Sequence, residues 1–242
     1  MALTNTPTSF GSVSRSLHWL TALLIFTAIG LSFLMDDHPK GSSAEIARAT
    51  FFFSLHKTVG VTAFFVALAR ILWGLTQPRP GLLNPDRRLE SVLAELVHWS
   101  LYGAMVIMPL SGWINHAATS GVPPIYWPFG QSLPLVPKSA NLGHLAMQVH
   151  SLAHIVLYAT IAMHILGALK HRFVDHDATL ARMVSGASVP VPEQRHSALP
   201  LALACAGWAF VFVVAYATAR TSPPPQAASA TGVLMQTAIE RL

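Results

Sequence analysis

The chemistry-bearing residues of this chain gather in one apolar stretch, residues 141–173, which is long enough to cross a bilayer. Two of its histidines, His150 and His164, are fourteen residues apart. On a helix this spacing is just under four turns, so both imidazoles lie on one face, about 21 Å apart along the axis. Ionisable side chains inside a membrane span are costly and usually functional. The spacing therefore predicts two stacked metal centres on one helix, one near each side of the membrane.

The composition indicates which kind of protein positions these residues. The 242 residues are 52% hydrophobic and only 10% charged, with a mean hydropathy of +0.49, which is far too apolar for an ordinary soluble domain. A spanning helix needs about 20 apolar residues. We therefore expect an all-α integral membrane protein with five spans: Leu17–Met35, Phe51–Leu75, Leu93–Ala117, Leu142–Leu169 and Ala198–Thr218.

The distribution of lysine and arginine predicts the orientation of these spans. Nine of these residues fall on the side of the N-terminus: Arg15, Arg70, Arg79, Arg87, Arg88, Lys170, Arg172, Arg182 and Arg195. Four fall on the opposite side before the fifth span: Lys40, Arg48, Lys57 and Lys138. The positive-inside rule then places the N-terminus in the cytoplasm and the C-terminus in the periplasm. The basic residues stand singly at helix ends, so we expect a lipid bilayer and no nucleic acid as partner.

Changes in composition divide the chain into five parts. We expect a polar N-terminal tail without regular structure (1–14), a four-helix bundle (15–184), a linker (185–197), an extra C-terminal transmembrane helix (198–219) and a periplasmic linker and tail (220–242). The extra helix contains no histidine and no charge, so we expect it to face lipid as an added anchor. The longest outer segment, 115–140, is rich in proline and aromatic residues, and it either lies in the membrane interface or covers an outer site.

The expected topology sorts four histidines into two levels. The first helix begins inside, which places His18 level with His164, and the second begins outside, which places His56 level with His150. Two facing imidazoles in a bundle core suit bis-histidine haem ligation. Zinc usually takes four ligands, and neither level offers a cysteine or an acidic residue.

Copper remains open as a weaker alternative to haem, because Met147 and Met163 lie in the same helix. Gly60 and Gly167 follow ligand candidates closely and would leave room for a flat macrocycle. Small residues are also common wherever membrane helices pack together, so the glycines alone do not decide between the two interpretations.

Four runs in the sequence resemble the bacterial cytochrome b561 family: RSLHWLTA, LHKTVGVTAFFVALARILWGLTQPRP, LVHWSLYGAMVIMPLSGW and HSLAHIVLYATIAMHILGALKHRFVDHDATLARM. The resemblance covers about residues 12–184. It implies a four-helix transmembrane bundle that holds two b haems, with His18, His56, His150 and His164 as axial ligands. The fifth helix and the tail depart from the minimal pattern of the family.

Other polar residues are candidates for supporting roles. By the resemblance, His98 is a hydrogen-bond partner near a haem, for example of a propionate. His154 either packs as a polar residue or tunes the outer haem or a quinone site. Arg70 is a further candidate beside a haem, although a cation near a helix end can also snorkel to the interface. Lys57 directly follows an outer ligand and, with Lys138, is our candidate for steering an anionic substrate.

Three hypotheses for function follow. The resemblance implies an oxidoreductase of the bacterial inner membrane that transfers electrons between a quinone and a donor or acceptor at the periplasmic face. Oxidation of superoxide coupled to reduction of ubiquinone is the specific form of this hypothesis. The alternative is a haem-bearing anchor and electron-transfer subunit of a larger respiratory enzyme, like those of hydrogenases and formate dehydrogenases, with a partner protein. A bundle whose histidines bind nothing is the third.

Overall fold

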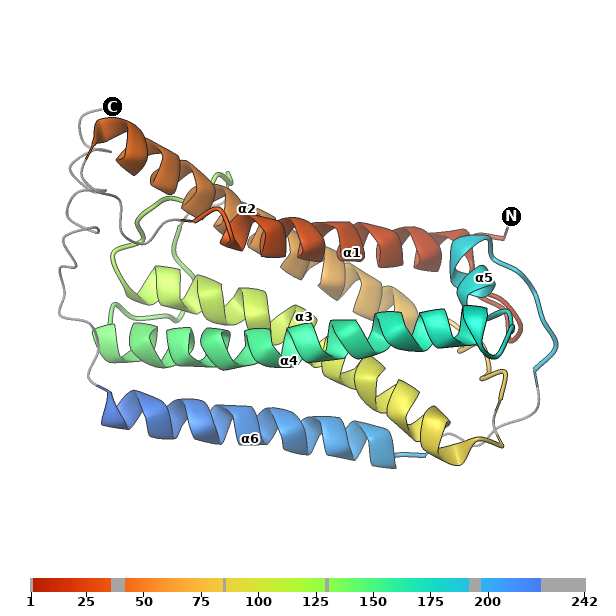
Figure 1. The fold of residues 1–242 in the computed structure, drawn as a ribbon. Helices are drawn as coiled ribbons and strands as arrows, with labels where there is room; N and C mark the ends of the chain where they lie inside the picture. The colour runs from red at the N-terminus through yellow and green to blue at the C-terminus, as the bar shows by residue number, and fades with distance from the viewer. Residues whose placement is uncertain (1, 36–41, 85, 129–130, 192–196, 223–242) are drawn as a thin grey trace. The chain divides into compact units, whose positions relative to one another are not determined.

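The computed structural model describes residues 2–35, 42–84, 86–128, 131–191 and 197–222, and no β-strand occurs among them. The helices in chain order are α1 (Ser12–Ser32), α2 (Ser43–Leu75), α3 (Arg88–Ala118), α4 (Ala140–Phe173), α5 (Thr179–Val184) and α6 (Leu199–Thr221), as Figure 1 shows. Of these described helices, all except α5 are long and apolar enough to cross a membrane. The predicted all-α membrane class is therefore confirmed, and each predicted span falls within or overlaps one of these helices.

Polar side chains satisfy the backbone where the helices begin. The hydroxyls of Ser42, Ser139 and Ser197 accept hydrogen bonds from backbone N–H groups in or next to the first turns of α2, α4 and α6. Such caps replace partners that the first turn of a helix lacks. Pro109 lies inside α3, where its missing N–H removes one intrahelical hydrogen bond without ending the helix, as neighbouring helices in a bundle permit.

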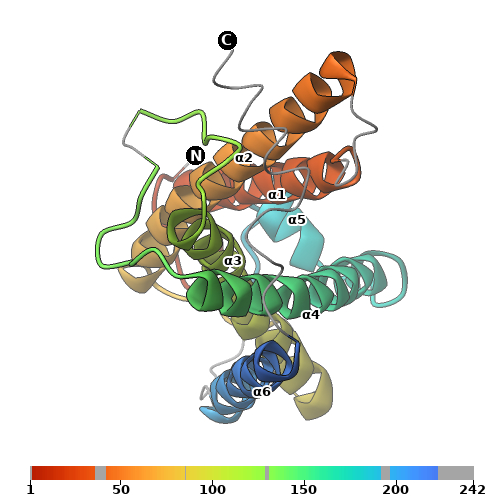
Figure 2. The same ribbon diagram turned by 90° about the vertical axis from the view of Figure 1, so that its left-hand side faces the viewer.

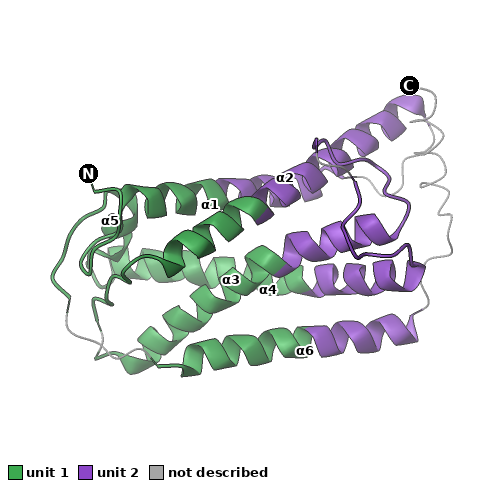
Figure 3. Cartoon of the chain, turned by 180° about the vertical axis from the view of Figure 1, so that it is seen from behind, with its two compact units in different colours: residues 1–22, 65–106, 153–211 green, residues 23–64, 107–152, 212–242 purple. Residues whose placement is uncertain are grey.

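The chain divides into two compact units, which Figure 3 distinguishes by colour. Unit 1 comprises Met1–Ala22, Phe65–Val106 and Ala153–Val211, and unit 2 comprises Leu23–Phe64, Ile107–Leu152 and Phe212–Leu242. The long helices contribute residues to both units. As a result, His150 belongs to unit 2, whereas His164, fourteen residues further along the same helix, belongs to unit 1.

Residues 2–11 of unit 1 contain no helix or strand, but hydrogen bonds to distant residues hold this segment in place. The backbone N–H of Asn5 donates to Gln77 Oε1 at 3.1 Å, and the N–H of Gly81 donates to the carbonyl of Pro7 at 3.1 Å. Figure 1 shows the N-terminus near α5. The segment is held by partners about 70 residues away, which local composition could not indicate. Residues 192–196 of the expected linker and 223–242 of the expected tail lie outside the described residues.

The composition of α6 suggested a lipid-facing anchor, but part of this helix is buried against the protein. Within unit 1 its residues Ala204, Trp208 and Val211 are buried and lie on one face at helical spacing. The indole of Trp208 packs on Gly103 of α3, because a Cβ at Gly103 would lie 2.1 Å from Trp208 Nε1. Figure 2 shows α6 as a separate helix below α4 in that view. A glycine at this point lets the two helices approach closely.

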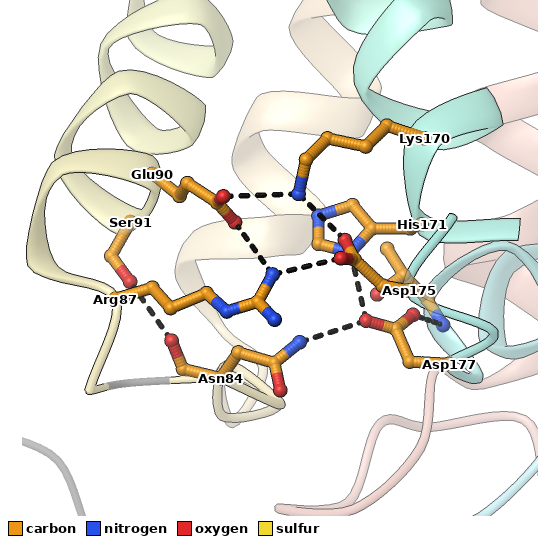
Figure 4. A network of polar contacts seen from close by, with 9 residues as sticks. Asn84, Arg87, Glu90, Ser91, Lys170, His171, Asp175 and Asp177 are labelled. Carbon is orange, nitrogen blue, oxygen red and sulfur yellow. Dashed lines mark hydrogen bonds and ion pairs between the residues drawn. The ribbon is translucent and has the colours of Figure 1, made fainter. Parts of the chain in front are cut away.

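A network of ion pairs joins the beginning of α3 to the end of α4 in unit 1 (Figure 4). Lys170 Nζ lies 2.8 Å from Asp175 Oδ2 and 3.0 Å from Glu90 Oε1. Arg87 Nη1 lies 2.8 Å from Asp175 Oδ1. Asp175 is the centre of the network, with its side chain only 7% exposed.

Three side chains of this network, His171, Asp175 and Asp177, have ligand atoms within 4.8 Å of one another, a spacing that could hold a metal ion. The carboxylate oxygens are already in use, however. Asp175 accepts from a lysine and an arginine, and Asp177 accepts from Asn84 Nδ2 at 2.8 Å and from the backbone of Thr179. Because two cations already neutralise this cluster, we assign it a structural role.

The network predicts a specific loss of stability in acid. Hydrogen bonds from Lys170 and Arg87 lower the pKa of Asp175 to about 2, below the roughly 3.9 of an unfolded aspartate. The stabilisation is therefore present above about pH 4 and is lost as the pH falls through about 2. We expect Asp175→Asn to lower stability at pH 7 and to flatten the decline of the melting temperature between pH 4 and pH 2. Exposed Asp86→Asn is the control, and an unchanged acid profile in Asp175→Asn would contradict the assignment.

Candidate functional site

The first candidate site lies in unit 2, where α2 supplies His56 and α4 supplies His150. The ring centroids of the two imidazoles are 6.5 Å apart and their planes are inclined by 77°. Both side chains are partly buried. The two rings are therefore close to perpendicular, and their separation is too wide for a hydrogen bond between them.

Backbone carbonyls fix the protonation of both rings of this pair. His56 Nδ1 lies 2.9 Å from the carbonyl oxygen of Ala28, and His150 Nδ1 lies 2.9 Å from that of Met108. A carbonyl oxygen only accepts, so each neutral ring carries its proton on Nδ1. Nε2 is therefore the unprotonated nitrogen of each ring, which is the tautomer that metal-ligating histidines usually show.

Two residues of α3 support His150 and were missed by the sequence analysis. Ser111 Oγ lies 3.3 Å from His150 Nδ1. At Gly112 an added Cβ would lie 3.3 Å from the same ring, so the glycine provides the space that the imidazole fills. Neither residue has a signal in the sequence, because a serine and a glycine are ordinary where membrane helices pack.

The second candidate site lies in unit 1, where α1 supplies His18 and α4 supplies His164. Their ring centroids are 6.0 Å apart, with an interplanar angle of 56°. His98 of α3 stands beside this pair, with its ring 5.0 Å from that of His164 and nearly perpendicular to it at 89°. His98 Nδ1 lies 2.6 Å from the carbonyl oxygen of Ala94, which fixes its proton there.

Arg70 distinguishes the His18–His164 pair from the first one. Its Nη2 lies 3.0 Å from His18 Nδ1. A guanidinium group only donates, so neutral His18 accepts at Nδ1 and carries its proton on Nε2. Neutral His18 would ligate a metal through Nε2 only with its proton moved to Nδ1, where Arg70 now donates, so ligation there requires Arg70 to give up this contact. Arg70 also lies over the ring of Tyr102, 5.6 Å from its centroid, and 3.8 Å from Met105 Sδ.

The separations of both pairs fit one metal between two imidazoles. A metal–imidazole bond is about 2 Å long and the ring centre lies roughly 1 Å beyond the nitrogen, so the ring centroids should be about 6 Å apart. The observed 6.5 Å and 6.0 Å agree with this value. A Cβ at Gly60 or Gly167 would meet no atom within 4 Å. Gly30, Gly74 and Gly207 share this property, so the space at Gly60 and Gly167 does not by itself indicate a macrocycle.

The two lysines that we expected to steer a substrate both have partners in unit 2. Lys57 Nζ is partly buried and lies 2.9 Å from the carbonyl oxygen of Pro123. It also lies 3.3 Å from His116 Nδ1, and His116 is only 2% exposed. Lys138 is exposed, and its ammonium donates to the carbonyl of Thr119.

His154 lies in unit 1, where its ring contacts that of Tyr158 at 5.4 Å. This contact is between aromatic neighbours one turn apart on α4. It agrees with the interpretation of His154 as a packed polar residue, and the alternative role beside a quinone or a haem gains no geometric support from it.

Comparisons with known proteins place these residues in a family context. A model of the family described as prokaryotic cytochrome b561 matches residues 9–186, which include both histidine pairs and end before α6. Cytochrome b561 homolog 2 of Escherichia coli (strain K12) is 28% identical over 190 residues, covering 78% of this chain and 97% of its own.

Two further relatives are similarly distant. Cytochrome b561 homolog 1 of the same Escherichia coli strain is 27% identical over 175 residues, covering 72% of this chain and 96% of its own. The probable superoxide oxidase CybB of Yersinia pestis is 26% identical over 177 residues, covering 72% of this chain and 95% of its own.

Proposed function

The chain belongs to the prokaryotic cytochrome b561 family and is a multi-pass bacterial membrane protein of electron transfer; we propose that it holds two b-type haems and exchanges electrons between ubiquinone and a donor at the periplasmic face. His56 and His150 would hold one haem, and His18 and His164 the other. The observation that carries this proposal is the separation of the two ring pairs, 6.5 Å and 6.0 Å, with the Nδ1–H···O=C contacts of the first pair.

The contribution of the protein is to fix ligands and charge around each haem. The carbonyls of Ala28 and Met108 hold the Nδ1 protons of one pair, so Nε2 is the nitrogen through which each ring would coordinate. Arg70 places a permanent positive charge against His18 in the other pair. Haem iron, when bound, supplies reversible one-electron chemistry whose potential depends on ligands, burial and nearby charge.

Superoxide is the donor that we propose, because one relative is named a probable superoxide oxidase and because two lysines lie in the unit that the positive-inside rule assigns to the periplasmic side. Two superoxide anions each lose one electron and leave as dioxygen. One ubiquinone takes up both electrons and two protons to become ubiquinol. The charge of Lys57 and of exposed Lys138 would raise the local concentration of the anion.

The test is a spectroscopic assay on the purified protein in lipid nanodiscs. We expect superoxide pulses to reduce the haem and to convert added ubiquinone to ubiquinol at two superoxide anions per quinol, whereas hydrogen peroxide does not. Lys138→Gln is expected to lower the superoxide rate severalfold and to weaken its dependence on ionic strength. A haem spectrum that changes with neither superoxide nor ubiquinol would contradict the proposal. A spectrum that changes only when a soluble subunit copurifies would also contradict it and would favour the anchor-subunit alternative.

A further inference from the structure

Lys57 of α2 is surrounded by three hydrogen-bond acceptors of unit 2. Its Nζ lies 2.9 Å from the carbonyl oxygen of Pro123, 3.3 Å from that of Val122 and 3.3 Å from His116 Nδ1. The two carbonyls belong to the loop between α3 and α4, and His116 belongs to the last turn of α3. The side chain therefore joins three parts of unit 2 through one nitrogen atom.

The protonation of His116 follows from Gln131. The amide of Gln131 is oriented by Ile125, whose backbone N–H donates to Oε1 at 2.7 Å and whose carbonyl accepts from Nε2 at 2.9 Å. Gln131 Oε1 also lies 3.1 Å from His116 Nε2. An amide oxygen only accepts, so His116 carries its proton on Nε2 and its Nδ1 is an acceptor.

All three partners of Lys57 thus accept hydrogen bonds, and an ammonium group has three N–H donors to match them. A neutral amine would instead direct a lone pair at one acceptor. Among the described residues no carboxylate lies within ion-pair distance of Lys57. The side chain is consequently a partly buried cation that is fully hydrogen-bonded and has no compensating charge.

This cation lies next to a candidate axial ligand. Lys57 directly follows His56, and with consecutive Cα atoms about 3.8 Å apart its extended side chain keeps the ammonium within roughly 14 Å of the His56 ring. A positive charge at that distance favours addition of an electron. With an effective dielectric constant of about 20, Coulomb's law gives about a tenfold change in the equilibrium between reduced and oxidised forms.

We infer that Lys57, held in its charged form by His116 and Gln131, is a positioning residue that raises the reduction potential of the haem at the His56–His150 pair. The inference rests on the proposed function, since it requires haem at that pair. Through Lys57, His116 and Gln131 would belong to the redox site although neither would touch the haem. The charge acts through the field at the site and not through a bond to the ligand.

The test is a redox titration of the full-length protein with optical detection. Removing the charge in Lys57→Met should lower one of the two midpoint potentials by about 59 mV, the equivalent of a tenfold change for one electron, and leave the other unchanged. Placing a carboxylate beside the ammonium in His116→Glu should lower the same potential. The matched controls Lys57→Arg and His116→Gln keep the charge uncompensated and should retain the wild-type values.

The possible outcomes separate this inference from the proposed function. Two haems with unchanged potentials in both Lys57→Met and His116→Glu would overturn the inference and leave the proposed function intact. Loss of one haem from both variants would also overturn it, because Lys57 would then be needed for holding the haem and not for its potential. Absence of haem from the wild-type protein would overturn the proposed function and the inference together.

Discussion

Replacing His150 by alanine is expected to lower the haem content from two per chain to one, and His164→Ala is expected to remove the other haem. Each substitution deletes one of two axial nitrogens, and the remaining imidazole of the pair cannot hold a six-coordinate b-type haem alone. The two ring pairs lie in different units of the chain. Loss of one haem should therefore leave the spectrum of the other largely unchanged.

The haem content of these variants is measured by extraction and quantified against protein concentration. His144→Ala is the matched control, because His144 lies on the same helix but belongs to neither pair, and it should retain two haems. The double variant His150→Ala with His164→Ala should contain none. Retention of both haems in either single variant would show that the ligands have been assigned wrongly.

The second large effect concerns the contact between α3 and α6. Gly103→Val places methyl groups where the indole of Trp208 now lies, since a Cβ alone would approach Trp208 Nε1 to 2.1 Å. Trp208 is only 8% exposed. We expect a loss of about 1–3 kcal/mol of stability, as for overpacking elsewhere, or separation of α6 from unit 1. The readouts are the midpoint of denaturant unfolding in detergent and the difference in tryptophan fluorescence between variants with and without Trp208, since the chain has six tryptophans.

A matched control exists on α6 itself. At Gly207 an added Cβ would meet no atom within 4 Å, so Gly207→Val introduces the same side chain without a clash and should leave the midpoint nearly unchanged. Trp208→Ala in the Gly103→Val background should restore part of the lost stability, because it removes the overlapping ring. Equal effects of the two glycine substitutions would contradict the packing described here.

The spans and the histidine pairs could be predicted from the sequence because their signals are local and periodic. Apolar length alone indicates a membrane helix, and fourteen residues between His150 and His164 define one face of such a helix. The pairing of His56 with His150 and of His18 with His164 followed from the direction of each span. The ring contacts in both units have the same partners.

The supporting contacts could not be predicted because they join residues distant in the sequence. Arg70 and His18 are separated by 52 residues, and Lys57 and His116 by 59. Composition gives no hint of such a partner when each residue also has an ordinary role at a helix end.

The buried face of α6 escaped prediction for a different reason, although the helix itself was predicted. In lipid, the free energy of an apolar side chain is similar whether it contacts a neighbouring helix or an acyl chain. Hydropathy therefore does not distinguish the buried face of the helix from the exposed one. The burial of Ala204, Trp208 and Val211 and the position of Trp208 against Gly103 identify the packed face.

The ratio of haem to chain in the purified wild-type protein, combined with its reduced-minus-oxidised spectrum, tests the central claim most directly. We predict two b-type haems per chain, each with the spectrum of bis-histidine ligation. A colourless protein would contradict it, because the ring pairs at 6.5 Å and 6.0 Å would then be only packed histidines. A single haem per chain would also contradict it, because the two pairs could not both be haem sites.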